Sequence, residues 1–84
     1  MVRVIVERRF EPPISEAELQ AVIERMAPCF ELHDVTWRRS FLSQDRRRMF
    51  CEYDAPDAES VRDVQRQAAA PFEIAWTAEV FEPA

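Results

Sequence analysis

The middle of the chain, residues 35–54, reads VTWRRSFLSQDRRRMFCEYD. Apolar and aromatic residues recur in its two halves, Val35 to Ser43 and Arg48 to Asp54, and a polar run around Gln44 and Asp45 separates them. Two such segments joined by a short polar stretch are typical of a β-hairpin. The chain contains no glycine, which tight two-residue hairpin turns usually need. We therefore predict an antiparallel hairpin whose turn is longer than two residues.

A helix is predicted before this hairpin. Ser15 and Glu18 have the spacing of a capping box, in which each side chain bonds to the backbone amide of the other residue. The apolar residues that follow share one helical face: Leu19, Val22, Ile23 and Met26. Proline disfavours helix in the residue before it, so Pro28 should end or kink this helix near Ala27.

A second helix and two outer strands complete the pattern. Asp57 is the predicted N-cap of a helix that reaches towards Pro71, and its apolar stripe is Val61, Val64 and Ala68. The segments Val2 to Phe10 and Phe72 to Phe81 alternate as strands with one buried side do. In the first of these strands one face carries Val2, Val4, Val6 and Phe10, and the other carries Arg3, Ile5, Glu7 and Arg9.

The resulting element order, β-α-β-β-α-β, predicts an α+β fold of the ferredoxin-like kind. In that sandwich, two helices cover one face of a four-stranded antiparallel sheet. The first and third strands should lie in the centre, with the fourth beside the first. We expect residues 1–84 to form a single domain of this kind, since the length suits one core.

The helices leave the other face of the sheet open, and alternation along the strands predicts which residues lie on it. The residues expected to face the helices are Val4, Val6, Val35, Trp37, Phe41, Met49, Cys51, Tyr53, Ile74, Trp76 and Val80. Those expected on the open face are Ile5, Glu7, Arg38, Ser40, Glu52, Glu73, Thr77 and Glu79. A register that places Arg3 opposite Glu79 and Arg9 opposite Glu73 would form two opposite-charge pairs and leave Glu7 without a cation.

Glu7 and Glu52 are the candidate functional carboxylates of this face. They could lie close together on the two central strands, with Arg38 as counter-ion and Ser40 beside it. Such a group can be an ion-pair lattice, a small polar pocket for a cation or ligand, or a catalytic acid–base pair. Two carboxylates sharing a site favour a divalent metal as neutraliser. His33, the only histidine, is the one imidazole that could join them, although a lone loop histidine is more often a surface residue.

Composition excludes several classes of function. The formal net charge is −5, which argues against nucleic-acid or anionic-membrane partners. The absence of glycine rules out phosphate-binding loops, the Rossmann fingerprint and the glycine-lined nucleophile elbow. The RNA-recognition motif shares the predicted topology, but residues 47–53 lack its glycine and carry Glu52.

Localisation is predicted from two absences. No apolar run approaches the roughly 20 residues of a membrane span, and charges interrupt the N-terminal segment where a signal peptide would need an apolar run. Cys29 and Cys51 have neither CxxC nor zinc-site spacing. We expect two reduced thiols in a cytoplasmic protein.

Several segments, taken in order, give a resemblance that spans nearly the whole chain. They are Val6-Glu7-Arg8, Trp37-Arg38-Arg39-Ser40-Phe41, residues 51–59 (CEYDAPDAE), Val61-Arg62, Pro71 and Glu79-Val80. With these segments the chain resembles a bacterial family of small ferredoxin-like domains, long catalogued as of unknown function, with nickel-binding members. The resemblance implies a homodimer packed through the sheet faces, and nickel binding in some members. Family members commonly carry histidine where this chain has Arg39 and Val64, so a metal site here would rely mostly on oxygen ligands.

We therefore expect a dimeric binding module that holds a divalent metal such as nickel, or a small polar ligand, on the open face. The residues expected to bind are Glu7, Arg38, Ser40 and Glu52 for a ligand, and Glu7, Glu52 and His33 for a metal. One alternative is a small cofactor-independent enzyme, an isomerase or monooxygenase, whose cleft between sheet and helices would use Tyr53, Trp37 or His33. The other is a purely structural dimerisation domain.

Overall fold

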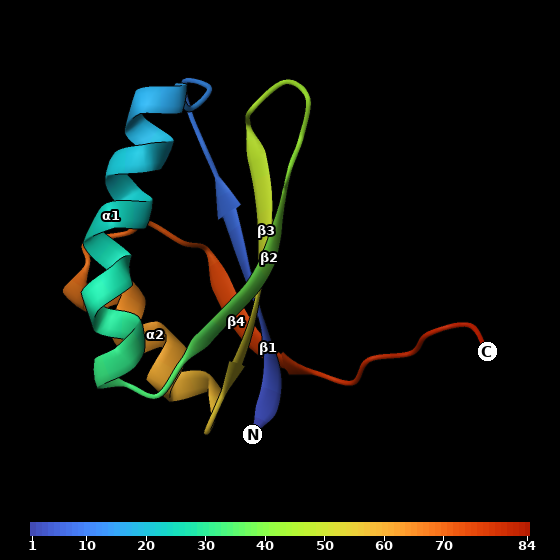
Figure 1. The fold of residues 1–84 in the computed structure, drawn as a ribbon. Coiled ribbons are helices and arrows are strands. Elements are labelled where there is room, and N and C mark those ends of the chain that lie inside the picture. Colours follow the sequence, from blue (N-terminus) through green and yellow to red (C-terminus); the bar gives the residue numbers. More distant parts are fainter.

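The predicted order of strands and helices is confirmed in the computed structural model, which describes all 84 residues (Figure 1). The elements are β1 (Val2–Arg9), α1 (Glu16–Leu32), β2 (Thr36–Leu42), β3 (Arg48–Ala55), α2 (Ala58–Gln67) and β4 (Ile74–Ala78). The strands form one antiparallel sheet in the order β2-β3-β1-β4, and both helices cover the same face of it. The chain therefore has the ferredoxin-like α+β fold, and neither helix has the length and apolar character needed to cross a membrane.

Helix α1 begins as predicted but ends later. The Glu18 amide donates to the Ser15 hydroxyl at 3.1 Å, and the Glu18 carboxylate accepts from the Ser15 amide at 3.4 Å. The prediction that Pro28 ends the helix near Ala27 is wrong, because α1 continues to Leu32. Pro28 lies on the exposed side of the helix, where water can replace the one bond that proline removes. The turn beyond it is held by Phe30, which packs against the core.

Helix α2 is capped by Asp57, as predicted. The Asp57 carboxylate accepts from the Ser60 amide at 2.7 Å. The helix ends at Gln67, and Ala69 then takes a left-handed backbone conformation with φ of 51°. That conformation is unfavourable for alanine. The connection to β4 therefore depends on bonds from other elements, and Arg25 of α1 donates to the Ala68 carbonyl at 2.8 Å.

The hairpin between β2 and β3 has a turn over residues 43–47, so the prediction of a turn longer than two residues is confirmed. The Ser43 hydroxyl accepts from the amides of Arg47 and Arg48 at 3.3 and 3.0 Å. Arg46 supplies the positive φ, 63°, that glycine would usually supply. Side-chain hydrogen bonding thus replaces glycine in shaping this turn.

A β-bulge in β2 overturns part of the predicted face assignment. The register with β3 shifts between Trp37 and Arg39. Beyond the shift, Ser40 lies opposite buried Cys51, and Phe41 lies opposite exposed Phe50. Phe41 was predicted to face the helices and Ser40 the open face, and both predictions are wrong. One extra residue in a strand reverses the alternation of every side chain after it.

The register of β4 also differs from the prediction, by one residue. Ile5 pairs with Trp76 and Val6 with Ala75, while Arg3 lies opposite Ala78 instead of Glu79. Ile74 and Trp76 are therefore on the open face, Thr77 is on the helix side opposite Val4, and Val80 lies beyond the strand. Arg62 of α2 donates to the Ala75 carbonyl at 2.6 Å, so α2 lies close over β4. Under α2, the inward position opposite Val6 is taken by Ala75, which is 2% exposed. The predicted register gives this inward side of β4 to larger side chains.

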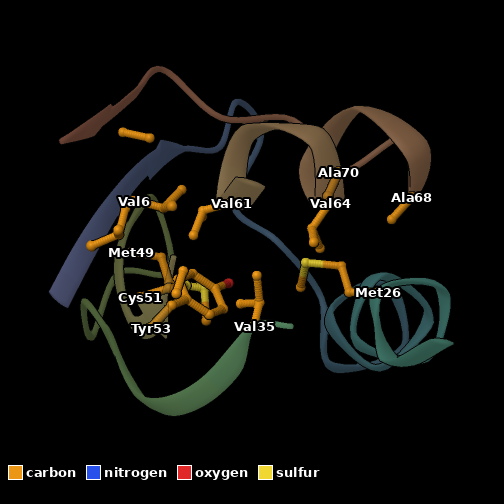
Figure 2. Close-up of a cluster of buried hydrophobic side chains, with 13 residues drawn as sticks. Val6, Met26, Val35, Met49, Cys51, Tyr53, Val61, Val64, Ala68 and Ala70 are labelled. Atoms are coloured by element: carbon orange, nitrogen blue, oxygen red, sulfur yellow. The ribbon is translucent and has the colours of Figure 1, made fainter. Parts of the chain in front are cut away.

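The core lies between the helices and the sheet. Figure 2 shows side chains of α1, α2 and the central strands meeting in this layer. Most of the predicted inward residues are buried there: Val4, Val6, Val35, Met49, Cys51, Tyr53, Val61, Val64 and Ala68. Tyr53 is the largest of the fully buried side chains, and its ring lies 5.7 Å from that of Phe30. Cys29 and Cys51 are free thiols.

Candidate functional site

The open face is built from three cross-strand rows of side chains, each read from β2 through β3 and β1 to β4. The rows are Phe41-Phe50-Glu7-Ile74, Arg39-Glu52-Ile5-Trp76 and Thr36-Asp54-Arg3-Ala78. Apolar side chains dominate the first row and the β4 side, and charged side chains gather towards β2. Six of the nine exposed large hydrophobic residues lie on this face or just beyond it: Phe41, Phe50, Ile74, Trp76, Val80 and Phe81.

The charged side of the open face is an ion-pair network. Arg3 donates to Glu52 at 2.8 Å and to Asp54 at 2.9 Å, and Arg39 donates to the other oxygen of Glu52 at 3.0 Å. Arg38 pairs with Asp54 at 3.5 Å, so it is not the counter-ion of Glu7 or Glu52. Both carboxylate oxygens of Glu52 are therefore already occupied by arginine.

Glu7 is different, because it has no ion pair. It lies between Phe50 and Ile74 in the first row, and its one side-chain partner is the Trp76 indole, which donates to Oε2 at 2.7 Å. The other two carboxylates on the strands, Glu52 and Asp54, are each bound by two arginines. Glu7 and Glu52 are diagonal neighbours on one face, since Glu52 lies two residues along β3 from Phe50. Of these three strand carboxylates, only Glu7 is free to bind a ligand.

The structure does not bring Ser40 and His33 to these carboxylates. Ser40 faces the helix side and accepts from the Trp37 indole at 2.9 Å. His33 caps the end of α1, and its ring shares a 2.8 Å hydrogen bond with Gln67 at the end of α2. No three side chains of the histidine, cysteine, aspartate or glutamate type are grouped to hold a metal ion. One chain therefore does not assemble Glu7, Glu52 and His33 into a metal site.

Sequence reasoning missed Arg8, a charged residue in the core. Its side chain is 4% exposed, and it donates to the Tyr53 hydroxyl at 3.1 Å, to the Gln65 side-chain oxygen at 2.6 Å and to the Pro71 carbonyl at 3.0 Å. All of these acceptors are neutral, so no carboxylate offsets the buried charge. The signal was present, because Arg8 follows Val6 at the spacing that puts it on the inward face.

The layer between helices and sheet has no room for a substrate. The cavity there is bordered by Arg8, Met26, Trp37 and Tyr53 and has a volume of about 10 Å³, enough for about one water molecule. A larger, open groove of about 480 Å³ is lined by α1, by residues 9–12 at the end of β1 and by Pro71. The enzyme alternative names Tyr53, Trp37 or His33 as its working residues, and none of them lines this groove.

Burial also sets the protonation of Tyr53. Desolvation raises the pKa of the phenol far above its ordinary value of 10.0, the nearby Cys51 raises it further, and the Arg8 guanidinium lowers it only in part. The phenol is therefore neutral and cannot serve as an anionic partner for Arg8. It also resists ionisation for as long as the fold persists.

Above pH 10 we expect the free energy of unfolding to fall by about 1.4 kcal/mol per pH unit, because the unfolded chain releases the Tyr53 proton and the native chain keeps it. Tyr53 is the only tyrosine, so tyrosinate absorbance reports this one group. As the pH is raised, the tyrosinate absorbance should increase over the same pH range in which the circular dichroism of the folded protein is lost. In Tyr53→Phe this alkaline loss of stability should disappear. Ionisation near pH 10 in a still-folded protein would contradict the expectation.

Comparisons with known proteins agree with this architecture. The sequence model of the nickel responsive protein SCO4226-like family matches residues 5–75, a segment that includes Glu7, Arg8 and Glu52. The crystal structure of SCO4226 from Streptomyces coelicolor A3(2) superposes with a TM-score of 0.83 at 14% identity, over 95% of this chain and 99% of that chain. At that identity the superposition shows a shared fold. No curated protein sequence matches the chain.

Proposed function

Because the chain belongs to the nickel-responsive SCO4226-like family, we propose that it is a homodimeric binding module. Two copies pack through their open faces, and Glu7 binds a divalent cation, or the cationic group of a small polar ligand, between them. The observation that carries this proposal is an unpaired carboxylate in the middle of an exposed apolar surface. The two free thiols suit a reducing compartment, and we place the protein in the cytoplasm.

The apolar surface supports the dimer. Phe41, Phe50, Ile74 and Trp76 come from three strands, lie on one face and are each between 36% and 57% exposed. Contiguous exposed apolar surface of this kind usually marks an interaction site. A domain of 84 residues also buries a modest share of its surface alone, so covering this face adds burial that a single copy lacks.

Glu7 supports the binding function. Covering the open face would take its carboxylate out of water, and a buried charge is costly unless a cation accompanies it. Arginine side chains supply that cation for Glu52 and Asp54, but no cationic side chain of the same copy pairs with Glu7. A bound cation between the copies would supply the missing charge.

The residues of a single chain do not fit a nickel site. Imidazole suits nickel, yet the only histidine, His33, lies in the helical layer, and Glu52 is held by two arginines. The strands of one copy therefore offer a single free carboxylate on this face. A site completed by Glu7 of both copies and by water would bind through oxygen, and would discriminate weakly between nickel, cobalt and zinc.

Calorimetric titration of the metal-free dimer with nickel, cobalt and zinc chlorides tests the proposal. Glu7→Gln keeps the size of the side chain and its hydrogen bond from Trp76 but removes the charge, and it should abolish the heat of binding. Glu73→Gln is the matched control, since Glu73 is an exposed carboxylate paired with Arg9 at 3.4 Å. At 100 times the dissociation constant, the metal should stabilise wild type and this control by about 2.7 kcal/mol. Equal binding by Glu7→Gln would overturn the role of Glu7, and no binding by wild type would leave a structural dimerisation domain.

A further inference from the structure

The chain continues beyond β4 as an extended arm, residues 79–84. The arm leaves the sheet on the side away from the helices (Figure 1). Its aromatic residue, Phe81, is 87% exposed, and its two carboxylates, Glu79 and Glu82, form no ion pair or side-chain hydrogen bond. Glu82 lies beside Arg3, Arg38 and Arg39 of its own chain without pairing with them. The arm therefore presents an exposed aromatic side chain and two carboxylates that form no bond within one copy.

A complementary notch lies at the hairpin end of the open face. It has a volume of about 260 Å³ and is lined by Phe41, Leu42, Ser43, Arg48 and Phe50. Arg48 is the one arginine whose side chain makes no hydrogen bond or ion pair. It lies opposite Arg9 across the β1–β3 pair, and like charges in that position repel. The notch thus combines exposed aromatic surface with an unneutralised cation.

We propose that the arm of one chain docks into this notch of a second copy, with Phe81 against Phe41 and Phe50 and an arm carboxylate on Arg48. The inference rests on the dimer proposed above and adds a reciprocal contact that each copy both gives and receives. Aromatic surface meets aromatic surface, and the acidic groups of the arm meet the free guanidinium. The same contact offsets the repulsion between Arg48 and Arg9.

The positions of the arm and the notch favour a second copy as the occupant. The arm starts at Ala78, in the row of Arg3, whereas the notch borders the row of Glu7, about 13 Å away along β1. With a two-fold axis perpendicular to the strands, the strands of the two facing sheets run in opposite directions. The arm end of one sheet then lies over the hairpin end of the other. Phe81 is the third residue beyond Ala78 and reaches about 10 Å in an extended chain, which is short of the notch of its own copy. In this dimer the arm begins over the hairpin end of the partner, so Phe81 does not have to span the length of β1.

Cross-linking between two differently labelled chains tests the contact. Both chains carry Cys29→Ser, and Cys51 is buried. One chain carries Ala84→Cys at the tip of the arm, and the other carries Gln44→Cys, which is exposed in the hairpin turn beside the notch. The control acceptor is Glu24→Cys, exposed on α1. After mixing to exchange subunits, a short bismaleimide should join the Ala84→Cys and Gln44→Cys chains at least about tenfold faster than the control pair, since docking raises the effective concentration.

Adding Phe81→Ser to the arm chain should reduce this rate to that of the control. Phe81 is almost fully exposed, so the substitution leaves the fold intact. Equal rates for the Gln44→Cys and Glu24→Cys acceptors in a protein that sediments as a dimer would overturn the arm contact and leave the dimer standing. Sedimentation of wild type as a monomer at all concentrations would overturn both proposals. A fast rate that Phe81→Ser does not change would also overturn the contact, because it would assign the arm to another surface.

Discussion

Arg8→Ala should lower the free energy of unfolding by about 3–5 kcal/mol. The substitution removes the donor from two buried acceptors, on Tyr53 and Gln65, and from the partly buried Pro71 carbonyl, and it leaves a cavity where the side chain packed. Domains of this size have a total stability of roughly 4–13 kcal/mol, so the substitution should remove a substantial part of it. Urea denaturation followed by circular dichroism measures the loss.

Two further variants separate lost packing from lost hydrogen bonding. Arg8→Met retains most of the volume but leaves the same acceptors without a donor, so we expect it to be intermediate between wild type and Arg8→Ala. The triple variant Arg8→Met, Tyr53→Phe, Gln65→Met replaces most of the polar group with apolar side chains of similar size. It should recover stability relative to Arg8→Met alone, because unpaired buried acceptors cost more than apolar replacements. A triple variant no more stable than Arg8→Met would show that the hydrogen-bond network is not the reason for the effect.

Ile74→Glu should raise the dissociation constant of the proposed dimer by at least about 100-fold. Ile74 is half exposed on the open face opposite Glu7, so the new carboxylate adds a like charge in the middle of the apolar surface. The two-fold symmetry of a homodimer introduces this penalty twice. Sedimentation equilibrium over a concentration series measures the change.

Leu32→Glu is the matched control for that experiment. Leu32 is 71% exposed at the end of α1, in the layer away from the open face, and it undergoes the same chemical change. It should leave the dissociation constant at the wild-type value. If Leu32→Glu weakens the dimer as much as Ile74→Glu does, the copies do not associate through the open face. Circular dichroism of both variants confirms that any difference comes from association and not from unfolding.

Local sequence features predicted correctly where the two helices begin and where the hairpin turns. The capping box at Ser15, the N-cap at Asp57 and the polar turn near Gln44 each act through residues a few positions apart, and all three are present in the structure. Pro28 shows the limit of such reasoning. Its local preference to end a helix is overcome because Phe30, two residues further on, gains burial against the core.

The candidate site was predicted only in part. Glu7 and Glu52 do share the open face, and the alternation of β1 and β3 was sufficient to place them there. The face of Ser40 was not predictable, because the β2 bulge that moves it is a property of pairing with β3. Arg38 lies within this bulge and pairs with Asp54 of β3, so its partner was not predictable either. The position of His33 depends on how the ends of α1 and α2 meet, which alternation along the strands does not describe.

The sequence by itself determined the order of elements, the fold class and the burial of the two central strands, because these follow from hydrophobic periodicity and capping within single segments. The tertiary structure alone decided the register of β4, the bulge in β2 and the isolation of Glu7. A one-residue shift in pairing changes no local propensity, yet it turns every side chain of an edge strand to the other face. The register of β4 follows from packing under α2, where the small side chain of Ala75 fits. This register leaves Ile74 and Trp76 beside Glu7 on the open face.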